Sequence, residues 1–111
     1  MKDDVVFIRH ILEEVNYIIR KTGSLSYEDF VNDETLTKAV ARSLEIIGEA
    51  TKNLSVSFRE KHPDVRWREL AGLRDKLIHQ YWGVNLEIVW DVIRNLIPGI
   101  EEKLKRILEN H

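Results

Sequence analysis

Apolar residues in the first half of the chain recur at steps of three and four, which is the spacing of an amphipathic α-helix. Two such rows are present, and they consist of Ile8, Ile11, Leu12, Val15, Ile18 and Ile19, and of Leu36, Val40, Leu44, Ile47, Ala50 and Leu54. We expect Asp3 or Asp4 to cap the first helix and Gly23 to end it. We expect Asp33 to begin the second helix, after a linker, "SLSYEDF", in which Ser26 opens a single helical turn.

The second half of the chain continues the helical pattern. A short helical piece within "SVSFREKHPD" is broken by Pro63, and a third helix is expected over residues 65–81, before Gly83. The side chains of that helix available for burial are Trp67, Leu70, Ala71, Leu77 and Ile78. Asn85 caps a fourth helix that extends to Ile107. Pro98 should kink or restart this helix, because proline lacks an amide hydrogen and clashes with the preceding turn.

The fold class predicted by this pattern is all-α. No segment alternates convincingly as a strand would, and "DVVFI" runs directly into the first helical row. The sequence therefore predicts an antiparallel four-helix bundle with a short extra helix and a Pro-kinked last helix, forming a single domain over residues 1–111. Gly48 lies inside the second helix, where glycine costs about 1 kcal/mol relative to alanine. We expect close approach of another backbone to explain it.

Composition excludes several kinds of protein. The chain has no cysteine, which excludes disulfides and thiolate metal sites and favours an intracellular setting. No apolar run approaches the roughly 18 residues of a membrane span, and the acidic start does not resemble a signal peptide, so we expect a cytoplasmic protein without a membrane partner. The net charge of −2 argues against a general nucleic-acid coat protein. The most basic stretch, residues 59–76, is typical of a solvated face but leads into a more informative motif.

That motif is "RDKLIHQYW", which places Arg74, His79 and Tyr81 within eight residues. Arginine offers a permanently charged fork that matches phosphate oxygens, and histidine exchanges a proton near neutral pH. These two groups suffice to cleave RNA without a metal, because the attacking 2′-hydroxyl belongs to the substrate. The ordinary interpretation is a solvated helix end, with the histidine near terminal carbonyls and the tyrosine in a core or interface.

Helical geometry restricts how the motif works. Five residues separate Arg74 from His79 by roughly 140° around a helix axis, so the two do not share a face. The long arginine side chain can wrap around the helix, or the last turn before Gly83 can loosen. A third solution is a homodimer in which two copies of the motif surround one cleft, with one histidine as base and the other as acid. The apolar surface of the last helix also favours a homodimer.

The sequence resembles the HepT-like family of HEPN domains, which are the ribonuclease toxins of two-component toxin–antitoxin pairs. The resemblance covers nearly the whole chain and rests on "LEIIGEATKNLS", on "FREKHPDVRWRELAGLRDKLIHQYWGVNLEIVW" and on the order of helices. The family motif is Arg, four to six residues, then His, with Tyr two residues later in the narrower form. Arg74, His79 and Tyr81 match it.

The resemblance implies a homodimeric helical bundle with metal-independent endoribonuclease activity and RNA as its substrate. It also implies an antitoxin of the minimal nucleotidyltransferase (MntA) type that transfers AMP to Tyr81. Arg74 and His79 would then be catalytic: His79 as general base or acid, and Arg74 on the scissile phosphate. Asp75 either orients a side chain of the site or is simply solvated. No cofactor is implied.

Other polar residues are left outside this predicted site. Glu45 and Glu49 lie one turn apart on the second helix and either face the motif or are ordinary exposed glutamates. His10, His62 and His111 show no spacing that would support a metal site, and His62 in the "KHPD" turn is expected to be structural.

Two other functions remain open. The first is a non-catalytic helical subunit that holds a nucleotide or substrate for a separate nucleotidyltransferase, in which Arg74 and Tyr81 bind phosphate and His79 is incidental. The mild acidity of the chain favours it, because strong RNA binders usually carry more positive charge. The second is a plain dimerising interaction domain. The Arg-x4-His-x-Tyr spacing favours the ribonuclease.

Overall fold

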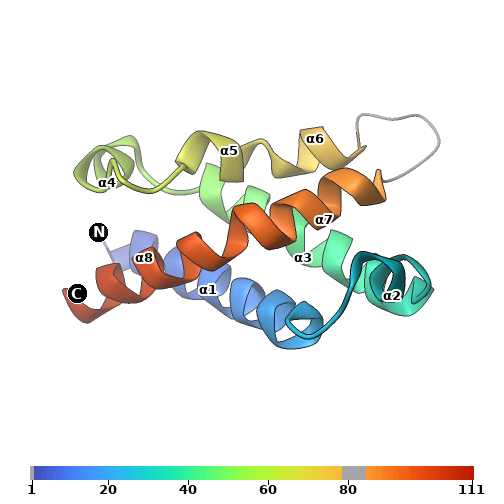
Figure 1. The fold of residues 1–111 in the computed structure, drawn as a ribbon. Helices are drawn as coiled ribbons and strands as arrows, with labels where there is room; N and C mark the ends of the chain where they lie inside the picture. The colour runs from blue at the N-terminus through green and yellow to red at the C-terminus, as the bar shows by residue number, and fades with distance from the viewer. Residues whose placement is uncertain (1, 79–84) are drawn as a thin grey trace.

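The expectation of an all-helical chain is confirmed. The computed structural model describes residues 2–78 and 85–111, and within these ranges every regular element is a helix. The helices are α1 (Lys2–Thr22), α2 (Tyr27–Val31), α3 (Glu34–Lys52), α4 (Val56–Lys61), α5 (Trp67–Ala71), α6 (Leu73–Ile78), α7 (Leu86–Asn95) and α8 (Ile97–Glu109). The long helices run in alternating directions (Figure 1). Helix α1 packs on α3 and α8, while α3 also packs on α5 and α6.

Most of the predicted helix ends are confirmed. The Ser26 side chain accepts from the amide of Asp29, whose carboxylate in turn accepts from the Ser26 amide, which forms a capping box at the start of α2. Asp33 caps α3 and Asn85 caps α7. Helix α1 ends directly before Gly23. These local signals fix where the helices begin, and hence how their apolar faces enter the core.

The predicted cap of α1 is wrong. The helix begins at Lys2, so Asp3 and Asp4 lie in its first turn and do not precede it. Asp4 is buried, and its carboxylate accepts hydrogen bonds of 2.8 Å from both the amide and the hydroxyl of Ser55. Burial raises the pKa of Asp4, but these hydrogen bonds outweigh it and leave the pKa below its usual value. Since Ser55 also caps α4, Asp4 joins the start of α1 to the start of α4.

The predicted third and fourth helices are each divided. Helices α5 and α6 are separated at Gly72, whose amide donates to the Arg68 carbonyl and whose backbone (φ −86°, ψ 0°) ends the first piece. Leu73, which the sequence pattern did not select, is buried, whereas Ala71 is only half-buried. The expected restart at Pro98 is confirmed, since this residue lies in the first turn of α8, where no amide hydrogen is needed.

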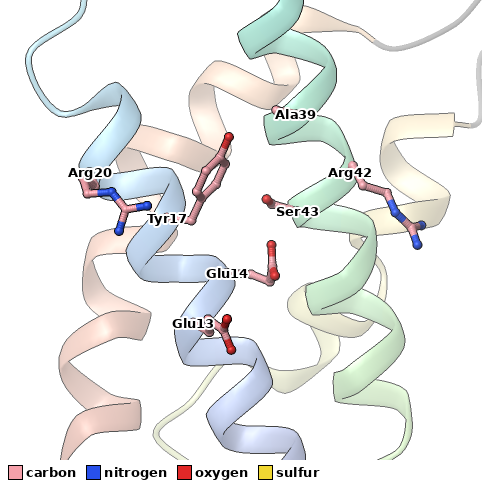
Figure 2. A pocket seen from close by; sticks show the side chains of 7 residues that line it. All are labelled: Glu13, Glu14, Tyr17, Arg20, Ala39, Arg42 and Ser43. Carbon is pink, nitrogen blue, oxygen red and sulfur yellow. The ribbon is translucent and has the colours of Figure 1, made fainter.

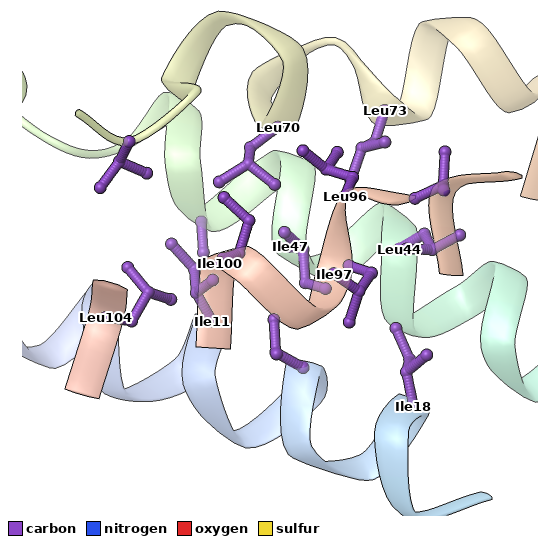
Figure 3. Close-up of a cluster of buried hydrophobic side chains, with 14 of the residues drawn as sticks. Ile11, Ile18, Leu44, Ile47, Leu70, Leu73, Leu96, Ile97, Ile100 and Leu104 are labelled. Carbon is purple, nitrogen blue, oxygen red and sulfur yellow. The ribbon is translucent and has the colours of Figure 1, made fainter. Parts of the chain in front are cut away.

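The core lies where α1, α3, α5–α6 and α7–α8 meet (Figure 3). Its fully buried aliphatic side chains include Ile11, Ile18, Leu44, Ile47, Leu70, Leu73, Ile97, Ile100 and Leu104. No helix within the described ranges has the length and apolar content needed to cross a membrane. The core therefore holds α6, which carries Arg74, against α3.

Candidate functional site

Arg74 is positioned by a close contact between two backbones. A Cβ atom placed on Gly48 of α3 would lie 3.3 Å from the Leu70 carbonyl oxygen and 3.5 Å from the Arg74 amide nitrogen. The expectation that Gly48 allows another backbone to approach is thus confirmed. Because Gly48 has no side chain to separate α3 from α6, the two helices are in direct backbone contact. The Cα of Arg74 is therefore held close to the surface of α3.

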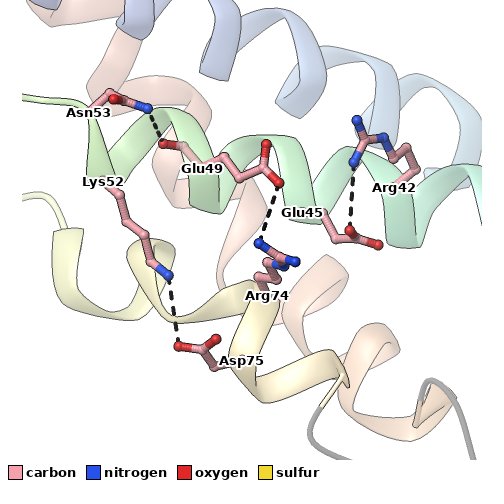
Figure 4. A network of polar contacts seen from close by, with 7 residues as sticks. All are labelled: Arg42, Glu45, Glu49, Lys52, Asn53, Arg74 and Asp75. Atoms are coloured by element: carbon pink, nitrogen blue, oxygen red, sulfur yellow. Dashed lines mark hydrogen bonds and ion pairs between the residues drawn. The ribbon is translucent and has the colours of Figure 1, made fainter.

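The Arg74 guanidinium points along this surface toward α3. Its Nη1 lies 3.9 Å from Oε1 of Glu49, and the two side chains are 54% and 48% exposed (Figure 4). A pair this long and this exposed contributes at most about 1 kcal/mol. As far as the described residues are concerned, the guanidinium therefore keeps most of its donors available to a phosphate group from solvent.

Further charged side chains continue the same surface. Asp75 is 80% exposed, and its carboxylate lies 3.8 Å from Nζ of Lys52. On α3, Arg42 pairs with Glu45 at 3.6 Å (Figure 4). The contact of Asp75 is thus with α3, and its two predicted roles, orienting the site or being merely solvated, both stay open. The result is a surface of alternating charge that includes the cations Arg74 and Lys52.

The other two motif residues, His79 and Tyr81, lie outside the described residues. Their distance from Arg74, and the convergence of Arg74 and His79 on one phosphate, stay predictions. What the structure describes of the predicted site is Arg74 and Asp75, both on the exposed face of α6.

Glu49 is the contact that the sequence did not assign. The one-turn spacing of Glu45 and Glu49 placed both on one face of a helix, but only the packing of α6 on α3 brings Glu49 to Arg74. Spacing alone did not distinguish the glutamate that pairs with Arg74 from the one that pairs with Arg42.

His62 has the structural role that was expected. Its ring packs on Phe58 and His111, with centroids 4.7 and 5.8 Å apart, and its carbonyl accepts from the Trp67 indole. Burial lowers the pKa of His62, and the charge of His111 lowers it further. Within residues 2–78 and 85–111, no group of three His, Cys, Asp or Glu side chains is arranged to hold a metal ion.

Comparisons with known proteins support the family resemblance on which the motif was identified. Residues 11–107 match the family model described as "Ribonuclease HepT-like". A "Putative RNase" of Caldanaerobacter subterraneus subsp. tengcongensis is 52% identical over 109 residues, which cover 98% of this chain and 97% of the relative. A "Putative RNase" of Methanocaldococcus jannaschii is 44% identical, with 98% and 90% covered. A "Probable ribonuclease HepT" of Thermococcus cleftensis is 40% identical, with 91% and 92% covered. No solved structure matches the chain.

Proposed function

Since this chain belongs to the HepT-like ribonuclease family, we propose that it is a metal-independent endoribonuclease and the toxin of a type VII-like toxin–antitoxin pair. The observation that carries the proposal is the exposed guanidinium of Arg74. Among the described residues it is paired only weakly, with Glu49, while the backbone of Arg74 is fixed by its contact with Gly48. It lies at the first position of the Arg-x4-His-x-Tyr spacing, inside the matched region.

The proposed reaction is an attack of the ribose 2′-oxygen on the adjacent phosphorus. The bond between O2′ and phosphorus forms while the bond between phosphorus and O5′ breaks, which leaves a 2′,3′-cyclic phosphate and a free 5′-hydroxyl. His79 removes the proton from the 2′-hydroxyl or gives one to the leaving 5′-oxygen. Arg74 stabilises the charge that develops on the phosphoryl oxygens.

The test is incubation of the purified chain with labelled RNA in EDTA. We expect cleavage that leaves 2′,3′-cyclic phosphate ends. We expect Arg74→Ala and His79→Ala each to lower kcat/KM by at least about a hundredfold, because each removes a group used in the transition state. Activity retained by both variants would exclude this mechanism.

A matched control is Arg66→Ala. Arg66 is also 54% exposed and paired with a glutamate, but it lies on the far side of Gly72 from the motif. We expect this variant to retain wild-type cleavage. A similar loss in Arg66→Ala would indicate a general effect of surface charge on RNA binding.

The proposed antitoxin is a minimal nucleotidyltransferase that adds AMP to Tyr81. The support is the position of Tyr81 two residues after His79 in the motif. An attached AMP would add bulk and negative phosphate beside Arg74 and His79, and so compete with RNA. Intact mass after incubation with the nucleotidyltransferase and ATP should increase in multiples of AMP, and Tyr81→Phe should abolish the increase. A mass shift that survives Tyr81→Phe would refute the assignment.

The second candidate is a non-catalytic subunit that holds a nucleotide or substrate for that nucleotidyltransferase. The net charge of −2 favours it, because RNA-binding proteins generally carry a basic excess. Transfer of AMP to a chain that cuts no RNA in any condition would support this candidate over the first.

The same proposal includes the architecture implied by the motif. We place residues 1–111 in one HEPN-type domain, with α5–α6 and α7–α8 as the divided third and fourth helices of a four-helix bundle. Two such chains form a homodimer, and the protein acts in the cytoplasm on RNA.

A further inference from the structure

Four charged side chains alternate in sign where α6 packs on α3. Glu49 and Lys52 lie in the last turn of α3, and Arg74 and Asp75 are consecutive on α6. Each acid is paired with the cation of the other helix. Nη1 of Arg74 lies 3.9 Å from Oε1 of Glu49, and Nζ of Lys52 lies 3.8 Å from Oδ2 of Asp75 (Figure 4). This surface therefore carries two cations that come from two different helices.

Lys52 is as accessible to an anion as Arg74 is. The side chain of Lys52 is 50% exposed, and the Asp75 carboxylate beside it is 80% exposed. A separation of 3.8 Å is too long for a hydrogen bond, and exposed pairs of this kind contribute little to stability. Among the described residues, the Lys52 ammonium therefore has no strong partner that an RNA phosphate would have to displace.

The two cations are neighbours but do not occupy the same position. Glu49 and Lys52 are three residues apart, which separates them by about 4.5 Å along the axis of α3. Consecutive residues of a helix point about 100° apart, so Lys52 meets α6 on a different side from the one that Arg74 leaves. This arrangement suits two adjacent phosphates of one strand better than two oxygens of one phosphate.

We infer that Lys52 binds the RNA phosphate next to the one that is cut. The inference rests on the proposed function, which places the scissile phosphate at Arg74. The planar fork of arginine suits the phosphate whose geometry changes in the reaction, whereas the flexible lysine needs only to neutralise a charge. Asp75 holds the Lys52 ammonium beside α6 until RNA replaces it, so Asp75 has the first of its two predicted roles, orienting a side chain of the site. The preferred substrate is a strand with at least two successive phosphates.

The test removes the charge of one phosphate at a time. The position at which the wild-type chain cuts a short RNA is mapped first. An oligonucleotide of that sequence then carries ribose only at this position and deoxyribose elsewhere, so that only one bond can be cut. In two further versions the phosphate on the 5′ or the 3′ side of the scissile one is replaced by an uncharged methylphosphonate. We expect the wild-type KM to be about three- to tenfold higher for one of these two versions, because one contact with a lysine is lost.

The protein side of the test is Lys52→Met. We expect this variant to raise KM for the unmodified oligonucleotide by the same factor, with kcat little changed, and to lose the difference between it and that methylphosphonate version. Lys52→Arg should keep the difference. The matched control is Lys38→Met, since Lys38 is also exposed on α3 and paired with a glutamate but lies near the other end of the helix. It should retain the wild-type KM for every version.

Lys52→Met also leaves the Asp75 carboxylate without its cation, and this acid can itself repel a phosphate. The comparison is therefore repeated in chains that carry Asp75→Asn. We expect Lys52→Met to raise KM in this background as well, and the loss of the methylphosphonate effect to persist. A KM that returns to the wild-type value in the double variant would show that only the acid matters and would overturn the inference.

The remaining outcomes separate this inference from the proposed function. A structural role of Lys52 at the end of α3, where a cation suits the helix dipole, would not distinguish the oligonucleotides. An unchanged KM in Lys52→Met, or an equal rise for all three versions, would thus refute the phosphate contact while cleavage stands. A wild-type chain that cuts no RNA would refute the proposed function. Binding of the all-deoxy versions, followed by fluorescence anisotropy, then decides whether Lys52 contacts one phosphate or none.

Discussion

Among the described residues, Glu49 is the acidic residue that pairs with Arg74 of the candidate site. Its carboxylate lies 3.9 Å from the Arg74 guanidinium and would repel a phosphate arriving at the same cation. We expect Glu49→Gln to lower KM for RNA by about two- to fivefold with little change in kcat, because an exposed pair contributes less than about 1 kcal/mol. Steady-state cleavage of a short RNA measures both constants.

The control for this prediction is Glu45→Gln. Glu45 lies one turn away on α3 but pairs with Arg42, so its substitution should leave KM unchanged. An unchanged or higher KM in Glu49→Gln would show that the carboxylate does not compete with phosphate.

At the residue scale, the sequence indicated which residues matter better than it indicated which side chains contact each other. Arg74 was selected because a motif fixes its chemistry and spacing, and its role stays a prediction. The close backbone approach at Gly48 was found because a glycine inside a helix has a cost that requires an explanation. The pairing of Glu49 with Arg74 depends on how α6 lies across α3, which no local pattern specifies.

At the element scale, we expect substitution of two helical glycines to change the stability of the protein in opposite directions. A Cβ on Gly48 would press on the Leu70 carbonyl at 3.3 Å, whereas a Cβ on Gly99 of α8 meets nothing within 4 Å. We expect Gly48→Val to lower the free energy of unfolding by about 1–3 kcal/mol, because the α5–α6 backbone must move. We expect Gly99→Ala to raise it by about 0.5–1 kcal/mol, because alanine favours the helix.

Urea unfolding followed by circular dichroism measures both changes. Each glycine is the other's control, since both lie inside helices and differ mainly in the space around them. A rise in the free energy of unfolding for Gly48→Val, like that expected for Gly99→Ala, would show that helix propensity outweighs the backbone contact at Gly48.

The element boundaries show why one break was predictable and another was not. Proline cannot continue a helix without losing a hydrogen bond, so the restart of α8 near Pro98 follows from covalent structure. Glycine can continue a helix at a cost of about 1 kcal/mol, so Gly72 gave no comparable signal. The burial of Leu70, Leu73 and Leu77 gave no signal either, because their three-and-four spacing is that of one face of an unbroken helix.

At the scale of the whole molecule, the helical class and the order of helices followed from the apolar rows, because burying these rows requires the helices to pack together. The rows did not show where the outer surface of the bundle is hollowed. Glu14, Tyr17 and Ser43 appear in the sequence as ordinary positions beside the core, and only the packing of α1 on α3 shows that they line one hollow of about 440 Å³ (Figure 2).

The close contact between the backbones of Arg74 and Gly48 also affects how inactive variants are interpreted. Under the proposed function, fold and chemistry share this contact, so we expect a collection of variants selected only for loss of cleavage to contain substitutions at both positions. Those at residue 48 would be inactive because the helix is displaced, and those at residue 74 because the cation is missing. Measuring the amount of folded protein in each variant would sort such a collection into architectural and chemical losses.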